Sequence, residues 1–168
     1  PAAVKKMVAS VIASKEFQGG ALETQVLHTG GNGVSRVCLL GLGEKKECTL
    51  DVVQRAYGTA VMRLKKMKAK SVAFLVRDDV VKGKTIADVV GAVVLGARIA
   101  NYHTTQYKGK SKKETQSIAR VTLLVTQSDR ATKDAVRRAE TIAEGLDFVR
   151  YIANSPANYA TPQYFAES

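Results

Sequence analysis

Apolar residues in the first forty positions of this chain fall into short segments typical of strands. These are residues 7–12, 22–27 and 36–40. The second and third segments flank residues 28–33, where Asn32-Gly33 supplies the positive φ angles that a tight hairpin turn needs. The pattern predicts a strand over residues 7–12, followed by a β-hairpin.

From residue 49 onward the apolar residues recur at helical spacing. Thr49 has the side chain of an N-cap, and Asp51 suits the first turn. The residues predicted to face the core are Val53, Tyr57, Ala60, Val61, Leu64 and Met67. This stripe predicts an amphipathic helix of about five turns.

Two strands and two helices are predicted to follow in alternation. Residues 71–76 and 119–126 are short and apolar, which is typical of strands covered on both faces. Thr85 and Asp88 form a capping signature for a second helix, and a third begins near Ser128 or Asp129 and stops before Pro156. The predicted buried stripes are Ile86, Val89, Val90, Val93, Val94 and Ala97, and then Ala135, Val136, Ala139, Ile142, Ala143, Leu146 and Val149.

This order predicts one α/β domain over residues 1–153, with helices on both faces of its sheet. Residues 107–116 are polar and rich in lysine, which predicts a loop. Thr161-Pro162 has the features of a helix start. Because a helix of under two turns has little stability alone, we expect residues 154–168 to be a linker and the first turn of a further domain.

Composition narrows the class of protein. No apolar run has the roughly 18 residues of a membrane helix, and the first 14 residues lack a secretory signal. Cys38 and Cys48 are too few and too far apart for a disulfide framework or a zinc site. We therefore expect a cytoplasmic protein with two reduced thiols and no membrane partner.

The chain is strongly basic, with 26 Lys and Arg against 15 Asp and Glu, a net charge of +11. Much of the excess lies in Arg63, Lys65, Lys66, Lys68 and Lys70, and in Lys108, Lys110, Lys112 and Lys113. A solvated surface explains both clusters, since one follows a helix C-terminus and the other lies in a loop. The alternative is contact with the phosphates of nucleic acid.

Three smaller features have structural explanations beside their functional ones. His28 and His103 have no ligand-type residue at metal spacing, so no metal site and no catalytic role is assigned. Gly41-Leu42-Gly43 could hold a nucleotide such as ADP-ribose, but a lone Gly-x-Gly also suits a plain turn. Asp78-Asp79 fits solvated loop charges better than a metal or acid–base pair.

The segment from residue 150 to residue 162 resembles the stretch that joins the two domains of leucyl (cytosol) aminopeptidases. The matching positions are Arg150, Asn154, Pro156, Asn158, Thr161 and Pro162. Residues 16–19 and 37–43, and Tyr102 with Tyr107-Lys108, also resemble that family. The resemblance covers essentially the whole chain.

The resemblance implies a three-layer α/β/α sandwich with a mixed sheet, similar to a macro domain. It implies a non-catalytic amino-terminal domain of a metalloaminopeptidase, a hydrolase that removes leucine-like residues from peptide N-termini. In that family, two divalent ions (zinc, manganese or magnesium) lie in the following domain, and the protein is a homohexamer. No catalytic or metal-binding residue is transferred to this chain, and its expected partners are its own catalytic domain and further copies.

Overall fold

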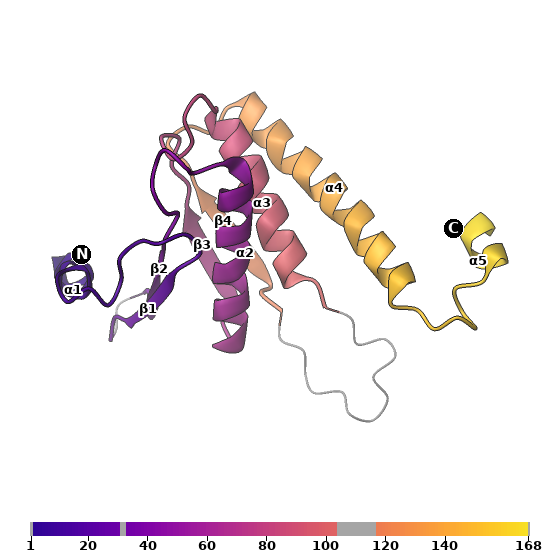
Figure 1. The fold of residues 1–168 in the computed structure, drawn as a ribbon, viewed down its shortest axis with the longest axis horizontal. Helices are drawn as coiled ribbons and strands as arrows, with labels where there is room; N and C mark the ends of the chain where they lie inside the picture. Colours follow the sequence, from indigo (N-terminus) through magenta and orange to yellow (C-terminus); the bar gives the residue numbers. More distant parts are fainter. Residues whose placement is uncertain (1, 31–32, 104–116, 168) are drawn as a thin grey trace.

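The computed structural model describes residues 2–30, 33–103 and 117–167 (Figure 1). The elements in these ranges are α1 (Ala2–Ala13), β1 (Thr24–His28), β2 (Arg36–Leu40), α2 (Leu50–Lys66), β3 (Ser71–Leu75), α3 (Ile86–Asn101), β4 (Arg120–Leu124), α4 (Arg130–Ala153) and α5 (Pro162–Glu167). The loop predicted at residues 107–116 lies outside the described residues.

The first element is a helix, so the strand predicted over residues 7–12 is wrong. The segment is rich in Ala, Lys and Met, which favour helices. Its half-buried residues Val4, Met7, Val8 and Val11 follow the i, i+3, i+4, i+7 spacing of one helix face. A short apolar segment is typical of a strand, but the spacing of these residues is helical.

The strands form two separate pairs among the described residues. β1 and β2 are antiparallel, with Val26 opposite Cys38, which confirms the predicted hairpin. β3 and β4 are parallel, with Ala73 opposite Thr122, and α3 is the crossover between them. The α/β class with mixed strand directions is therefore confirmed.

Each predicted helix start is found at a side-chain cap. The Thr49 hydroxyl accepts from the Val52 N–H at the start of α2, and Thr85 with Asp88 forms a complete capping box on α3. The Asp129 carboxylate accepts from the Thr132 N–H, so the third predicted helix begins at residue 130. These side chains satisfy N–H groups that the first turn of a helix leaves without a backbone partner.

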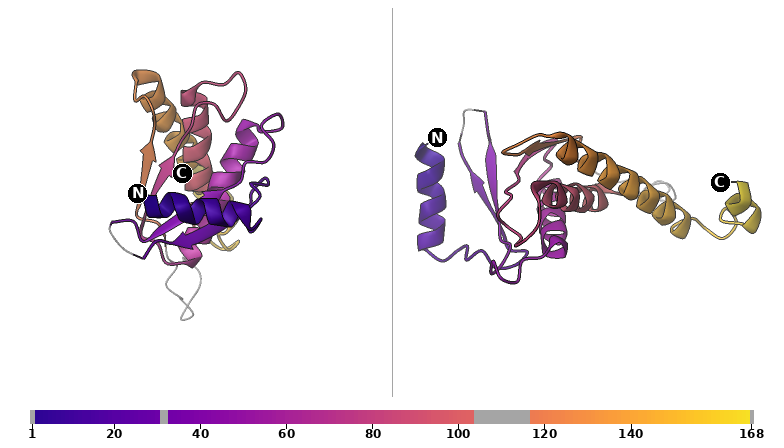
Figure 2. Two further views of the ribbon diagram at one scale, coloured as in Figure 1. Left: turned by 90° about the vertical axis from the view of Figure 1, so that its left-hand side faces the viewer. Right: turned by 90° about the horizontal axis from the view of Figure 1, so that it is seen from above.

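Helices α2, α3 and α4 lie side by side along one side of the strands, and α1 lies beyond the hairpin on the other (Figure 2). The main core lies between the helices and the strands, and includes Val53, Val61, Phe74, Val90 and Val93. No described helix is long and apolar enough to cross a membrane.

The strands β3 and β4 are covered on one face only, so the prediction that both faces are buried is wrong. Phe74 points toward the helices and is buried, whereas Leu75 on the opposite face is 68% exposed. On β4, Leu123 packs on the core and Leu124 is 50% exposed. In the described residues nothing packs on this outer face.

Helix α4 buries its predicted stripe only in its first half. Ala135, Ala139 and Ala143 are buried against α3, as predicted. Ile142 and Val149 are 54% and 60% exposed, and Leu146 is exposed as well, so burial of these three is wrong. Contact between the two helices continues past these residues, because Arg98 lies 3.5 Å from Asp147 and Arg150 donates to the Ile99 carbonyl. The three apolar side chains therefore lie beside the alanine stripe that faces α3, while the end of α4 diverges from its neighbour (Figure 1).

Candidate functional site

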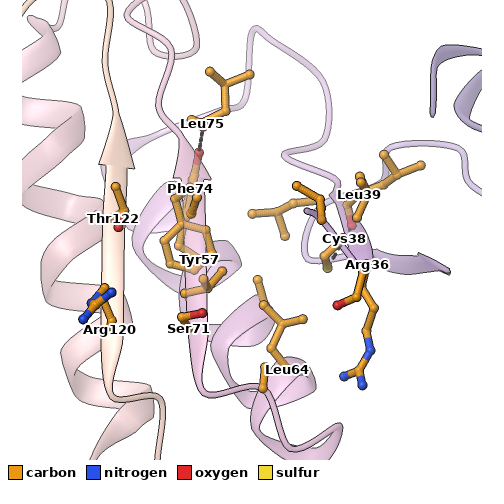
Figure 3. A pocket seen from close by; sticks show the side chains of 18 of the residues that line it. Arg36, Cys38, Leu39, Tyr57, Leu64, Ser71, Phe74, Leu75, Arg120 and Thr122 are labelled. Atoms are coloured by element: carbon orange, nitrogen blue, oxygen red, sulfur yellow. Dashed lines mark hydrogen bonds between the residues drawn. The ribbon is translucent and has the colours of Figure 1, made fainter. Parts of the chain in front are cut away.

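A cavity lies between the two strand pairs (Figure 3). It has a volume of about 930 Å³ and is bounded by β2 on one side and β3 on the other. Tyr57 and Leu64 of α2 form its floor. We call this cavity the β2–β3 groove.

The floor of the groove is ordered by Tyr57. Its ring meets Phe74 edge to face, with centroids 5.0 Å apart and an interplanar angle of 88°. Its hydroxyl donates a 2.7 Å hydrogen bond to the Leu75 carbonyl, and burial raises the pKa of this phenol. Tyr57 therefore remains a neutral donor to the strand edge at physiological pH.

One wall carries Cys38, whose side chain is half-buried. Burial raises the pKa of its thiol, an effect that the nearby Arg63 partly offsets. A raised pKa disfavours the reactive thiolate, so Cys38 behaves as an apolar wall residue. Cys48 is buried in the core, and both cysteines are free, in keeping with the prediction of reduced thiols.

The structure separates the basic residues that the sequence grouped together. Arg63, Lys66, Lys68 and Lys70 are exposed around the end of α2. Lys65 instead points to the end of α3, where its ammonium donates to the carbonyls of Ala100 (3.1 Å) and Asn101 (3.0 Å). Partial burial lowers the pKa of Lys65, and its role is to join two helix ends. Lys108, Lys110, Lys112 and Lys113 lie outside the described residues.

Two arginines act in the same way as Lys65: Arg36, which the sequence analysis did not single out, and Arg150, which it named only for the family resemblance. Arg36 donates from Nη1 to the Met67 carbonyl at 2.7 Å, after the end of α2. Arg150 donates from Nη1 to the Ile99 carbonyl at 2.9 Å and lies 5.3 Å from the centroid of the Tyr102 ring. The sequence did not indicate these contacts, because the partners lie 31 and 51 positions away.

The Gly41-Leu42-Gly43 turn is held by backbone contacts. A Cβ on Gly41 would lie 2.0 Å from the Gly20 carbonyl oxygen, so no larger residue fits there. The Gly41 N–H donates to Glu23 O and the Gly43 N–H to Gly19 O. Because both N–H groups already donate to backbone carbonyls, neither is available to bind a phosphate, which favours the plain turn over a nucleotide loop.

The remaining candidate residues do not converge. Asp79 is held by two hydrogen bonds from Arg77, at 2.9 and 2.8 Å, which lower the pKa of its carboxyl. His28 ends β1, His103 follows α3, and both are exposed. Over residues 2–30, 33–103 and 117–167, no cluster of three His, Cys, Asp or Glu side chains could hold a metal ion.

Comparison with known proteins gives the family. The sequence model of the cytosol aminopeptidase family, N-terminal domain, matches residues 1–111. The chain belongs to the cytosol aminopeptidase family. Its suspected resemblance to this family is therefore confirmed, and the matched region runs from α1 to beyond α3.

The relatives of this aminopeptidase domain are about three times as long as the chain. A "probable cytosol aminopeptidase" of Burkholderia lata is 32% identical over 168 residues, which cover 99% of this chain and 33% of the relative. The corresponding protein of Geobacter sp. (strain M21) is 30% identical over 157 residues, covering 92% and 31%. The chain thus spans about a third of the curated relatives that it matches.

Solved structures share the fold. The bottromycin maturation enzyme BotP in complex with Mn has a TM-score of 0.75 at 21% identity, covering 92% of this chain and 31% of its own. A mutant of tomato leucine aminopeptidase also has a TM-score of 0.75, at 18% identity, covering 98% of this chain and 32% of its own. At these identities the similarity establishes the fold alone.

Proposed function

We propose that this chain is the non-catalytic amino-terminal domain of a metal-dependent leucyl aminopeptidase and that it packs on the catalytic domain through α4. The observation that carries the proposal is an exposed apolar stripe on the second half of α4. Ile142, Leu146 and Val149 are spaced i, i+4, i+7 on one face and are exposed. An exposed apolar stripe of this kind is typical of a surface that packs against another domain.

The parent enzyme would hold two divalent ions (zinc, manganese or magnesium) in its catalytic domain and act in the cytoplasm as a homohexamer. The metal ions would activate water and polarise the scissile carbonyl. The full-length polypeptide is expected to release leucine from a leucyl chromogenic substrate when metal is supplied. Residues 1–168 alone are expected to release none, and metal-stimulated cleavage by this domain would contradict its non-catalytic role.

The packing role of α4 has its own test. Replacing Ile142 and Val149 with Ser in the full-length enzyme should lower its thermal stability, because each buried apolar side chain contributes about 1.5 to 3 kcal/mol. The matched control replaces Glu140 and Glu144, which are exposed on the same helix, with Ser. Equal melting temperatures for the two double variants would show that the stripe stays in solvent.

A second candidate function is binding to the phosphate backbone of nucleic acid. It is favoured by Lys68 and Lys70, which line the groove together with Arg36 and Arg120, and by the exposed Lys66 at the end of α2. No carboxylate of the described residues lines the groove. Changing the three lysines to Gln should reduce the slope of log affinity against log salt for duplex DNA by about 2 to 3. The control is a Gln variant of Lys5, Lys6 and Lys133, with the same change in charge, and no binding at low salt would reject this function.

A further inference from the structure

The two walls of the β2–β3 groove are strand edges that face each other without being paired. Among the described strands, β2 bonds only to β1, and β3 bonds only to β4. Figure 3 shows the two edges on opposite sides of the cavity, with Leu64 between them. Each edge leaves a row of backbone donors and acceptors without a strand partner.

The hydrogen-bond pattern identifies which residues of β2 face the groove. In the hairpin, the Thr29 N–H donates to Ser35 O and the Gly41 N–H donates to Glu23 O. Alternate residues of an antiparallel strand bond to the same neighbour, so the odd-numbered residues of β2 bond to β1. The backbone groups of Arg36, Cys38 and Leu40 therefore point into the groove.

The same reasoning applies to β3. Lys70 O accepts from the Arg120 N–H, and the Val76 N–H donates to Leu124 O, so the even-numbered residues bond to β4. The backbone groups of Ser71, Ala73 and Leu75 point the other way, toward β2. The Tyr57 hydroxyl already bonds the Leu75 carbonyl from the groove side, which agrees with this assignment.

The groove interrupts the main core. Tyr57, Leu64 and Phe74 belong to the core cluster and also line the groove, with Cys38 and Val72 packed at the margin of that cluster. An opening this large and this apolar exposes surface that a folded protein normally buries. Whatever fills it completes the core and joins both edges at once.

One end of the groove is positively charged. The Arg36 guanidinium donates to the carbonyl of Met67, the residue before Lys68, and the Lys70 carbonyl accepts from the Arg120 N–H. These contacts bring Arg36, Lys68, Lys70 and Arg120 to the same end of the groove. Within residues 2–30, 33–103 and 117–167, no Asp or Glu lines the groove. The occupant that this surface fits is extended, apolar along its length and acidic where it meets the cations.

We propose that the β2–β3 groove binds one further β-strand of the same polypeptide, from outside residues 1–168, and that this strand joins the two strand pairs into one sheet. The source follows from length and burial, because the relatives are about three times as long as this chain. A strand that fills a gap in the core must be present permanently, which a covalently linked segment ensures. The inference rests on the proposed function insofar as that function places this domain in a longer enzyme.

Hydrogen exchange of the full-length polypeptide tests the pairing directly. The Cys38 and Ala73 amides face the groove, and the adjacent Leu39 and Phe74 amides, which bond to β1 and β4, are controls within the same strands. With a strand inserted, the groove-facing amides should exchange within about tenfold of the rates of these controls. Groove-facing amides that exchange far faster than the controls would overturn the proposal.

A proline substitution tests the same hydrogen bond by stability. Ala73→Pro removes an N–H that faces the groove, which an unpaired edge tolerates and a central strand does not. The control is Ala73→Val, which keeps the N–H at a position whose side chain is exposed. In the full-length protein the Pro variant should melt several degrees below the Val variant, and equal melting temperatures would refute the added strand.

The two proposals can fail independently. Protected groove amides in a full-length protein that cleaves no leucyl substrate would retain the strand and reject the aminopeptidase activity. Rapid exchange at Cys38 and Ala73 in a protein that does cleave the substrate would reject the strand alone.

Discussion

Gly96 of α3 is a position where one added carbon should disturb the packing of two helices directly. A Cβ on Gly96 would lie 2.0 Å from the Gln54 carbonyl oxygen and 2.8 Å from its carbonyl carbon. Both are backbone atoms of α2, so no side-chain rotation relieves the contact. Because non-bonded heavy atoms pack at about 3.5 Å, α2 and α3 would have to separate by roughly 1 to 1.5 Å.

The cost can be estimated from overpacking. Forcing extra carbons into a packed interface costs about 1 to 3 kcal/mol, and the backbone contact places Gly96→Ala at the upper end. Alanine recovers about 0.5 to 1 kcal/mol because it constrains the unfolded chain more than glycine does. We expect a net loss of about 2 kcal/mol in the free energy of unfolding, or about 4 to 8 °C in melting temperature.

The control lies in the same helix. A Cβ on Gly91 meets nothing within 4 Å, so Gly91→Ala should stabilise the domain by about 0.5 to 1 kcal/mol. Urea unfolding followed by far-UV circular dichroism measures both variants. If Gly96→Ala has the same midpoint as Gly91→Ala, with an unchanged slope, the close approach of α2 and α3 is wrong.

Three further outcomes follow from the capping interactions. Thr85→Ala should lower stability by about 1 kcal/mol in thermal unfolding, because it breaks the capping box of α3. Backbone N–H bonds at the helix caps lower the pKa of Asp88 and Asp129. The stabilisation by these two ionised carboxylates is fully present above the unfolded pKa of about 4 and is lost as pH falls through the folded pKa. A double variant with Asp88→Asn and Asp129→Asn should therefore lose less stability on acidification than the unmodified protein does. Lys65→Met should lower the free energy of unfolding by about 1 kcal/mol, because it leaves two carbonyls at the end of α3 without their donor. The control is Lys66→Met at an exposed position, and equal melting temperatures for the two variants would argue against this role of Lys65.

The local elements of this fold could be predicted from the sequence where one short-range signal decided them. The hairpin followed from the turn residues, and the start of α3 from Thr85 and Asp88, three positions apart. Segment 7–12 is short and apolar, which is typical of a strand, but it forms part of α1. The apolar residues follow helical spacing only when positions 4–11 are taken together, so a window of six residues is too short to decide.

The candidate site could not be predicted because its parts are distant in sequence. The groove depends on which strand edges stay unpaired, and strand order is a property of the whole sheet. Lys65 appeared to belong with Lys66 and Lys68, yet its position on α2 directs it to the end of α3. A charge run shows where cations lie along the chain, but the helix face decides which of them meet solvent.

The incorrect burial predictions themselves bear on function. Leu75, Leu124, Ile142, Leu146 and Val149 were all predicted to be buried, and all are exposed. Covering side chains of this size stabilises a protein by about 1.5 to 3 kcal/mol each, as an upper estimate, so the five together approach the whole stability of a typical domain. The apolar pattern of a sequence reflects burial in the complete protein, whereas 168 residues show only what this part buries by itself. The outer face of β3 and β4 and the α4 stripe are therefore the surfaces on which we expect further contacts within a longer polypeptide.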